Sequence, residues 1–153
     1  MSIALNLQTV ATSAHNTLCR TQFMIDATDI RPDDRVVVIG QGSLEYLLGL
    51  VRAGCRSAVA IRSQALCRFE EVTADVIWFT GVVAFDADFT STFDHREVPR
   101  VVAIELMQDC TKARLSEILG QLRSRGLVDQ SVRKVAGRTV MVASRPTWLR
   151  RVI

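Results

Sequence analysis

The sequence predicts an α/β fold, a doubly wound sheet that is mostly parallel and closes with an antiparallel C-terminal hairpin. Apolar β-branched runs such as residues 36–39 show no alternation of polar and apolar side chains, which is typical of strands covered on both faces. Helical patterns separate these runs, and this alternation favours a parallel sheet. Two final strand patterns flank Ala136 and Gly137 and indicate the closing hairpin.

The 153 residues, 48% of them hydrophobic and 23% charged, have the size and composition of one globular domain. We expect a single domain over residues 1–153, with residues 1–30 as an N-terminal helical segment packed on it. The formal net charge of +3 is too small to require nucleic acid or a membrane as partner. No apolar run approaches the roughly 20 residues of a membrane span. The hydrophobic content is compatible with a homo-oligomer, which we expect.

The four cysteines are widely separated and include no Cys-x-x-Cys pair, and only two histidines could join them in a metal site. This spacing argues against a zinc site and against a disulfide framework. The N-terminus also lacks the basic and then apolar pattern of a secretion signal. We therefore expect no metal, and a cytoplasmic protein with reduced thiols.

The first part of the chain predicts a helix, a strand, a second helix and a second strand. Residues 1–20 fit an amphipathic helix, which residues 23–30 continue or end in a turn. Its apolar face would hold Leu7, Val10, Ala11, Ala14 and Leu18. After the strand at 36–39, a second helix ends at Gly54. Its apolar face would hold Leu44, Leu47, Leu48 and Val51. Residues 57–61 predict a second buried strand, which completes a right-handed βαβ unit.

The rest of the chain continues the alternation. Its expected elements are a brief helix within 64–73, a strand at 74–79, a long loop at 81–99, a strand at 101–106, a helix at 111–125 and hairpin strands at 132–135 and 139–143. Long loops are often lids or binding loops, although a solvated surface excursion fits this composition as well. Glu105 stands inside an apolar strand, where a carboxylate needs a partner unless the strand lies at an edge.

A glycine turn gives the strongest local signal for a ligand site. Gly40, Gln41, Gly42 and Ser43 join the first strand to the second helix. Glycines let the backbone pass close to a ligand, and the N–H groups of a following helix point toward it. In an open parallel sheet, ligands bind beyond the carboxyl ends of the strands. Thr80 and Gly81 close the third strand at the same edge, so they are further candidate contacts.

The chain resembles the class I S-adenosylmethionine-dependent methyltransferases. An N-terminal helix, the turn at 31–35, the glycine segment at 36–42 and the ending at 132–146 carry this resemblance, and residues 74–80 and 101–106 are similar to the family's fourth and fifth strands. It implies a Rossmann-like sheet of the methyltransferase type. It also implies S-adenosylmethionine as the cofactor. The implied cofactor contacts are Gly40, Gln41, Gly42, Ser43, Ile61, Arg62, Ser63, Thr80 and Gly81.

Three features depart from that family. The family carries an acidic residue at the end of its second strand to accept hydrogen bonds from the ribose, whereas this chain has Arg62, whose guanidinium only donates. An acid usually precedes the first glycine of the turn, where this chain has Val38 and Ile39. Too few residues separate Arg62 from Ala74 for the family's third strand. We therefore expect a sheet with one strand fewer than usual.

The residues leave three functions open. The first is a methyltransferase-like protein that binds S-adenosylmethionine, in which alignment of the acceptor would supply much of the rate, so no catalytic residue is predicted. The second is a non-catalytic scaffold that acts through protein association, because a shortened sheet leaves an edge and a face for a partner. The third is an NADP-binding module, because an arginine after the second strand can accommodate a 2′-phosphate.

Overall fold

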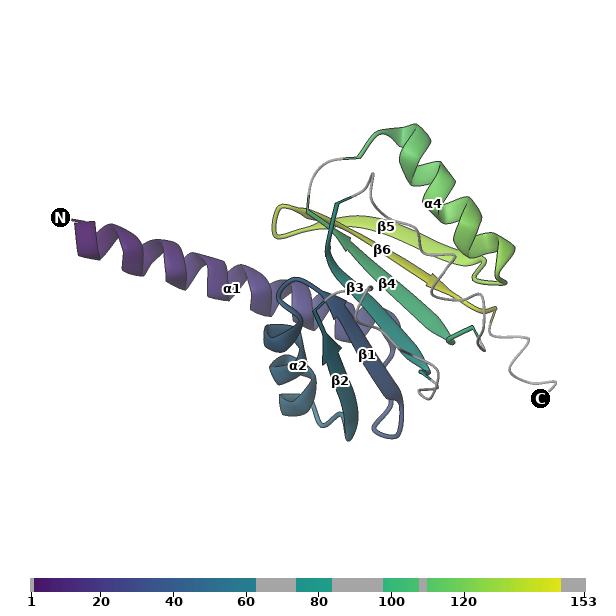
Figure 1. Ribbon diagram of the computed structural model, residues 1–153, viewed down its shortest axis with the longest axis horizontal. Helices are drawn as coiled ribbons and strands as arrows, with labels where there is room; N and C mark the ends of the chain where they lie inside the picture. The colour runs from purple at the N-terminus through teal and green to yellow at the C-terminus, as the bar shows by residue number, and fades with distance from the viewer. Residues whose placement is uncertain (1, 63–73, 84–97, 108–109, 147–153) are drawn as a thin grey trace.

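Figure 1 shows the computed structural model of the chain, which describes residues 2–62, 74–83, 98–107 and 110–146, with side chains from residue 15 onward. The brief helix predicted within 64–73, most of the loop predicted at 81–99 and the candidate Ser63 lie outside these residues. The helices are α1 Ser2–Thr28, α2 Ser43–Arg52 and α4 Lys112–Ser124. The strands are β1 Arg35–Gly40, β2 Ser57–Ile61, β3 Val76–Val82, β4 Val101–Leu106, β5 Asp129–Val135 and β6 Arg138–Ser144.

The described strands form one sheet in the order β2-β1-β3-β4-β6-β5. The pairs β1–β2, β1–β3 and β3–β4 are parallel, while β6 runs antiparallel to β4 and to β5. The predicted fold class, a mostly parallel α/β sheet with an antiparallel C-terminal hairpin, is therefore confirmed. No described strand pairs with the outer side of β2. The segment between Arg62 and Ala74, where we expected one strand to be missing, lies outside the described residues.

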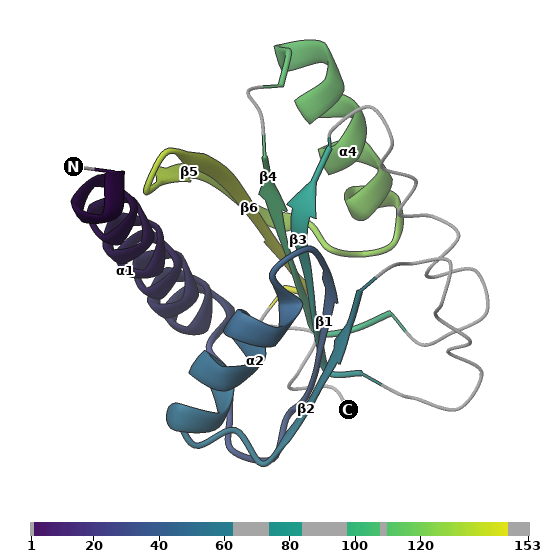
Figure 2. The same cartoon turned by 60° about the vertical axis from the view of Figure 1, so that its left-hand side comes forward.

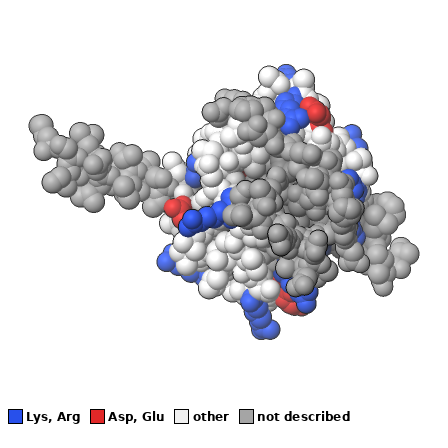
Figure 3. All heavy atoms as spheres, viewed as in Figure 1, with Lys and Arg blue, Asp and Glu red and all other residues white. Residues whose placement is uncertain are grey.

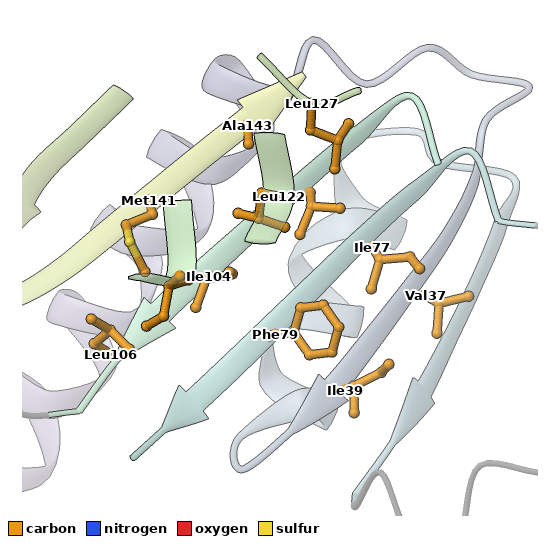
Figure 4. Close-up of a cluster of buried hydrophobic side chains, with 12 residues drawn as sticks. Val37, Ile39, Ile77, Phe79, Ile104, Leu106, Leu122, Leu127, Met141 and Ala143 are labelled. Atoms are coloured by element: carbon orange, nitrogen blue, oxygen red, sulfur yellow. The ribbon is translucent and has the colours of Figure 1, made fainter. Parts of the chain in front are cut away.

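Helices cover both faces of the sheet, with α1 and α2 on one face and α4 on the other (Figure 2). Successive residues of β1 point to opposite faces. Val36 and Val38 therefore pack in the cluster on the side of α1 and α2, and Val37 and Ile39 in the cluster on the side of α4 (Figure 4). All four are at most 2% exposed, which confirms the prediction of a strand covered on both faces.

The closing hairpin also follows the prediction. Val135 pairs with Arg138, so the loop contains only Ala136 and Gly137. Their φ angles are +48° and +81°, and two positive φ angles in a two-residue loop define the turn that matches the twist of a hairpin. The turn brings Arg138 back along the sheet beside β4.

Helix α1 runs without a break to Thr28, so the segment after residue 20 continues the helix. Met24 and Thr28 are fully buried, whereas Leu18 is 56% exposed. The prediction that Leu18 lies on the core face is wrong, because Arg20 and Thr21 occupy the side that faces the body of the protein. The N-terminal part of α1 extends beyond the sheet (Figure 1).

The predicted core face of α2 is wrong as well. Leu44, Leu48 and Val51 are 62%, 50% and 57% exposed and Leu47 is half-buried, while Tyr46 and Leu50 are buried against the sheet. The second side of α2 faces α1, since a Cβ placed on Gly49 would lie 2.4 Å from Cγ2 of Thr21. The leucine stripe is left on the remaining side because it is the side that neither the sheet nor α1 covers.

Strand β2 differs from its prediction in burial. It was expected to be a buried strand, but its residues are exposed or half-buried, and Val59 is 45% exposed. It pairs with β1 on one side only within the described residues. A strand at the edge of a sheet has fewer neighbours to cover its side chains, which accounts for the difference.

Candidate functional site

A pocket lies at the carboxyl edge of the sheet, where the strand order reverses. The chain leaves β1 for β2 on one side and later returns to β3 on the other, and such switch points are where open α/β sheets bind ligands. The cavity has a volume of about 170 Å³. We call it the switch-point pocket. Its lining residues are Thr17, Arg20, Gln41, Gly42, Glu45, Tyr46, Gly81, Met107 and Arg138.

Glu105 is fully buried and contacts four of the residues that line this pocket. Its Oε1 accepts hydrogen bonds from Nη1 of Arg138 at 2.5 Å and from the backbone N–H of Gly81 at 3.3 Å. Its Oε2 lies 3.2 Å from Nε of Arg20 and accepts a hydrogen bond from the Tyr46 hydroxyl. Both carboxylate oxygens are thus satisfied, as a buried charge requires. The alternative that Glu105 lies at a sheet edge is wrong, because β4 is an interior strand.

The two arginines of the pocket differ in how many of their N–H donors form hydrogen bonds. Arg20 has a side chain that is 7% exposed. Besides its ion pair with Glu105, it donates to the Tyr46 hydroxyl at 3.3 Å, to the Ala136 carbonyl oxygen at 3.4 Å and to the Thr17 hydroxyl at 3.3 Å. The side chain of Arg138 is 31% exposed, and Glu105 is the one hydrogen-bond partner of this side chain within the described residues. Because a guanidinium carries five N–H donors, Arg138 retains donors that can reach a ligand.

The glycine turn has a packing role at one end and an open side at the other. Gly40 has a φ of +126°, and a Cβ there would lie 2.0 Å from the carbonyl oxygen of Thr80. Thr80 is buried, and its hydroxyl donates to the carbonyl oxygen of Gln41 at 2.8 Å. Gly42 has a φ of +71°, and its nearest neighbour in the direction of a Cβ is Cε2 of Tyr46 at 3.8 Å. Gly42 therefore leaves space in the pocket, whereas Gly40 permits β1 and β3 to approach.

The structure brings part of the predicted cofactor site together. Gln41, Gly42 and Gly81 line the switch-point pocket. Three further candidates surround them without lining the pocket, namely Gly40, Ser43 and Thr80.

Ile61 and Arg62 do not join this pocket. Ile61 packs against the core cluster on the side of α4, whereas Tyr46, which lines the pocket, belongs to the cluster on the opposite face. Arg62 is exposed. Ile61, the last residue of β2, is therefore separated by the sheet from the helices α1 and α2 that wall the pocket, and Arg62 is absent from the lining of the pocket.

Sequence reasoning missed six residues that line the pocket: Thr17, Arg20, Glu45, Tyr46, Met107 and Arg138. They come from α1, α2, the end of β4 and the start of β6, so no local pattern connects them. One signal existed, since a glutamate inside an apolar strand implies a positively charged partner. The sequence alone does not say which of its arginines that partner is.

The described residues offer neither a metal centre nor a membrane span. Within these residues, no three His, Cys, Asp or Glu side chains form a group that could hold a metal ion. None of the described helices is long and apolar enough to cross a membrane. On the face drawn in Figure 3, basic and acidic side chains stand near one another at several points.

Comparison with protein-family models and with curated proteins finds no match. Solved structures do match. A putative tRNA methyltransferase of Streptococcus pneumoniae in complex with S-adenosyl-L-methionine superposes with a TM-score of 0.58 at 13% identity, over 82% of this chain and 72% of that one. A SAM-dependent methyltransferase of Aquifex aeolicus also gives 0.58 at 13% identity, over 84% and 90%. A putative S-adenosyl-L-methionine-dependent methyltransferase of Methanococcus maripaludis gives 0.56 at 12% identity, over 93% and 91%.

These likenesses establish the class of fold. The chain has the Rossmann-like α/β fold of the S-adenosylmethionine-dependent methyltransferases, as the resemblance in the sequence implied. Similar sheets carry many activities, so a function has to be argued from the pocket itself.

Proposed function

We propose that this protein binds S-adenosylmethionine in the switch-point pocket and acts as a methyltransferase. The observation that carries the proposal is the position of the pocket, between the glycine turn after β1 and Gly81 at the end of β3. A sheet of this order binds ligands at that point. The fold of the chain is shared with proteins of this chemistry, one of them solved with S-adenosyl-L-methionine bound.

The polar groups of the pocket suit the amino-acid end of that cofactor. Arg138 offers donors to a carboxylate. The first N–H groups of α2 are further donors, because the N-cap residue Gly42 has no side chain that could accept from them. Glu45 lines the pocket and has no ion-pair partner among the described residues, so it can accept hydrogen bonds from an ammonium group. The open side of Gly42 leaves room for this end of the molecule.

Methyl transfer from this cofactor requires few catalytic groups from the protein. S-adenosylmethionine supplies an electrophilic methyl group carried on a sulfonium. The residues of the pocket hold the donor and exclude water, and alignment of an acceptor with that methyl group contributes much of the rate. Glu105 acts as a positioning residue, since it fixes Arg138 through Oε1 and Arg20 through Oε2.

Calorimetric titration with S-adenosylmethionine, S-adenosylhomocysteine and NADPH tests the proposal. We expect the first two ligands to bind and NADPH to give no heat. At 100 times the dissociation constant, a bound ligand should stabilise the fold by about 2.7 kcal/mol in a thermal or chemical unfolding experiment. Failure of both adenosyl ligands to bind would contradict the proposal, and binding of NADPH alone would favour the nicotinamide alternative.

Two pairs of variants locate the binding. Arg138→Ala should weaken S-adenosylmethionine binding by about tenfold or more, because a hydrogen-bonded charge pair is lost. Arg133→Ala removes an arginine from the neighbouring strand β5, outside the pocket lining, and should change nothing. Gly42→Ala should weaken binding, whereas Gly126→Ala adds the same methyl group at a similar φ of +88° with no atom within 4 Å and should leave binding intact.

A second candidate function is a non-catalytic scaffold. The observation that favours it is the exposed arginine at the end of β2, where the methyltransferases carry an acid for the ribose. Such a protein would bind none of the three ligands in the titration and would act through a partner on its surface. The titration therefore separates the two candidates.

A further inference from the structure

The outer side of α2 carries an apolar stripe with no partner among the described residues. Leu44, Leu48 and Val51 are each at least half exposed, at 62%, 50% and 57%. Their spacing of four and three residues places them on one side of the helix. The other two sides of α2 are occupied by the sheet and by α1. An exposed apolar stripe along a helix is typical of an interaction surface.

Two opposite charges flank this stripe. Glu45 lies in the first turn of α2 and Arg52 lies in the last turn. Seven residues make almost two full turns, so both side chains lie on the same side of the stripe. Both residues are exposed, and neither has an ion-pair partner within the described part of the chain. The face is therefore acidic at one end, basic at the other and apolar between.

We infer that this face binds a second copy of the chain, with the two α2 helices antiparallel about a two-fold axis near Leu48. A two-fold axis of this kind reverses the direction of the helix but keeps its flank on the same side. Glu45 then faces the partner's Arg52, and Arg52 faces the partner's Glu45, as a self-complementary interface requires. A parallel arrangement would leave the charges of the two copies on opposite sides of the stripe.

The dimer would also reach the switch-point pocket. Glu45 lines that pocket as well as flanking the stripe. The partner's Arg52 would therefore lie near the rim of each pocket. The association itself rests on the face of α2 and is independent of which ligand the pocket binds.

Sedimentation velocity over a concentration series measures the association. We expect a species of about 34 kDa, twice the 17.0 kDa of the chain, that dissociates at micromolar concentration because the interface of one short helix is small. Leu48→Glu should weaken the dimer by about a hundredfold, since two carboxylates would be buried at its centre. Val132→Glu makes the same kind of change at a side chain that is 41% exposed on β5, and it should leave the dimer unchanged.

A charge exchange tests the antiparallel arrangement. Glu45→Arg alone and Arg52→Glu alone should each weaken the dimer by about tenfold, because each places like charges together. The double variant should recover most of that loss. All these positions are exposed, and circular dichroism verifies that each variant is folded. A chain that stays monomeric throughout the series, a Leu48→Glu dimer as tight as the original, or a double variant no better than the single ones would overturn the inference.

Discussion

The two halves of the carboxyl edge of the sheet differ in how their charges are held. Between β1, β3, β4 and β6, Glu105 is fully buried and is bound to Arg20, Arg138 and Tyr46 beside a cavity. At the end of β2, Arg62 is exposed. A buried and fully bonded charge network costs desolvation, whereas an exposed charge costs almost nothing. The difference teaches that the inner strands support the polar site of this fold, whereas the outer strand β2 does not contribute to it.

Of the changes considered, removal of the Glu105 carboxylate should lower the stability of the protein most. Glu105→Ala leaves the Arg20 guanidinium buried without its counter-charge, which should lower the free energy of unfolding by about 3 to 5 kcal/mol. The matched control is Glu117→Ala, which removes the surface pair between Arg114 and Glu117, whose side chains are 21% and 57% exposed. It should cost less than about 1 kcal/mol. Chemical denaturation measures both, and equal losses would show that the Glu105 network contributes no special stability.

The next effect concerns the close approach of β1 and β3 beside the pocket. Gly40→Ala places a methyl group 2.0 Å from the Thr80 carbonyl oxygen at a φ of +126°, so the strands must separate. We expect a loss of about 3 kcal/mol. Gly54→Ala, at a φ of +93° with no atom within 4 Å, should cost about 1 kcal/mol from backbone strain alone. Thermal unfolding of the two variants distinguishes packing from strain, and the same midpoint in both would contradict the assigned role of Gly40.

At the end of β2, a substitution can add the acidic residue that the S-adenosylmethionine-dependent methyltransferases carry after their second strand. Arg62→Asp introduces acceptors for ribose hydroxyl groups at an exposed position. If S-adenosylmethionine extends from the pocket toward β2, calorimetry should show tighter binding by up to about tenfold, with no change in stability beyond about 0.5 kcal/mol. Unchanged affinity would mean that the bound ligand does not reach this end of the sheet.

The smallest effect is a difference in cysteine reactivity. Cys19 is exposed next to Arg20, whereas Cys55 is half-buried just before β2. Burial raises the pKa of the Cys55 thiol; a backbone hydrogen bond at Ser57 offsets part of this rise, and the Asp34 carboxylate adds a smaller increase. Less of the thiol is therefore ionised at mildly alkaline pH, and the thiolate is the reactive form. Mass spectrometry after brief alkylation should find Cys19 modified first, and faster labelling of Cys55 would contradict this order.

The sequence predicted the strands and the hairpin well because each has a local cause. The run at residues 36–39 contains only apolar β-branched residues, which favour a strand buried on both faces. Ala136 and Gly137 can form the two-residue turn that joins β5 and β6. The burial of α2 was predicted wrongly because Leu44, Leu48 and Val51 outnumber the apolar residues on the side that packs on the sheet. Periodicity identifies an apolar stripe on a helix, but it cannot say whether the core or a partner covers it.

The candidate site was predicted only where it is local. Gln41, Gly42 and Gly81 follow strands whose ends the hydrophobic pattern marks, so their position at the edge could be predicted. Glu105 and its partners are far apart in the sequence, separated by 59 residues for Tyr46 and 33 for Arg138. Their meeting depends on the order of strands in the sheet and on the crossing of α1 over α2. Neither is specified by the pattern of any single segment.

The most direct test of the central claim is to map the binding of S-adenosylhomocysteine on the protein by nuclear magnetic resonance. The backbone amide signals of Gly42, Glu45 and Gly81 report on the switch-point pocket, and those of Ile61 and Arg62 report on the end of β2. We expect the largest shifts at the first three residues and smaller ones at the other two. Shifts confined to the end of β2, or none at a saturating concentration, would contradict the assignment of the ligand site to the pocket beside Glu105.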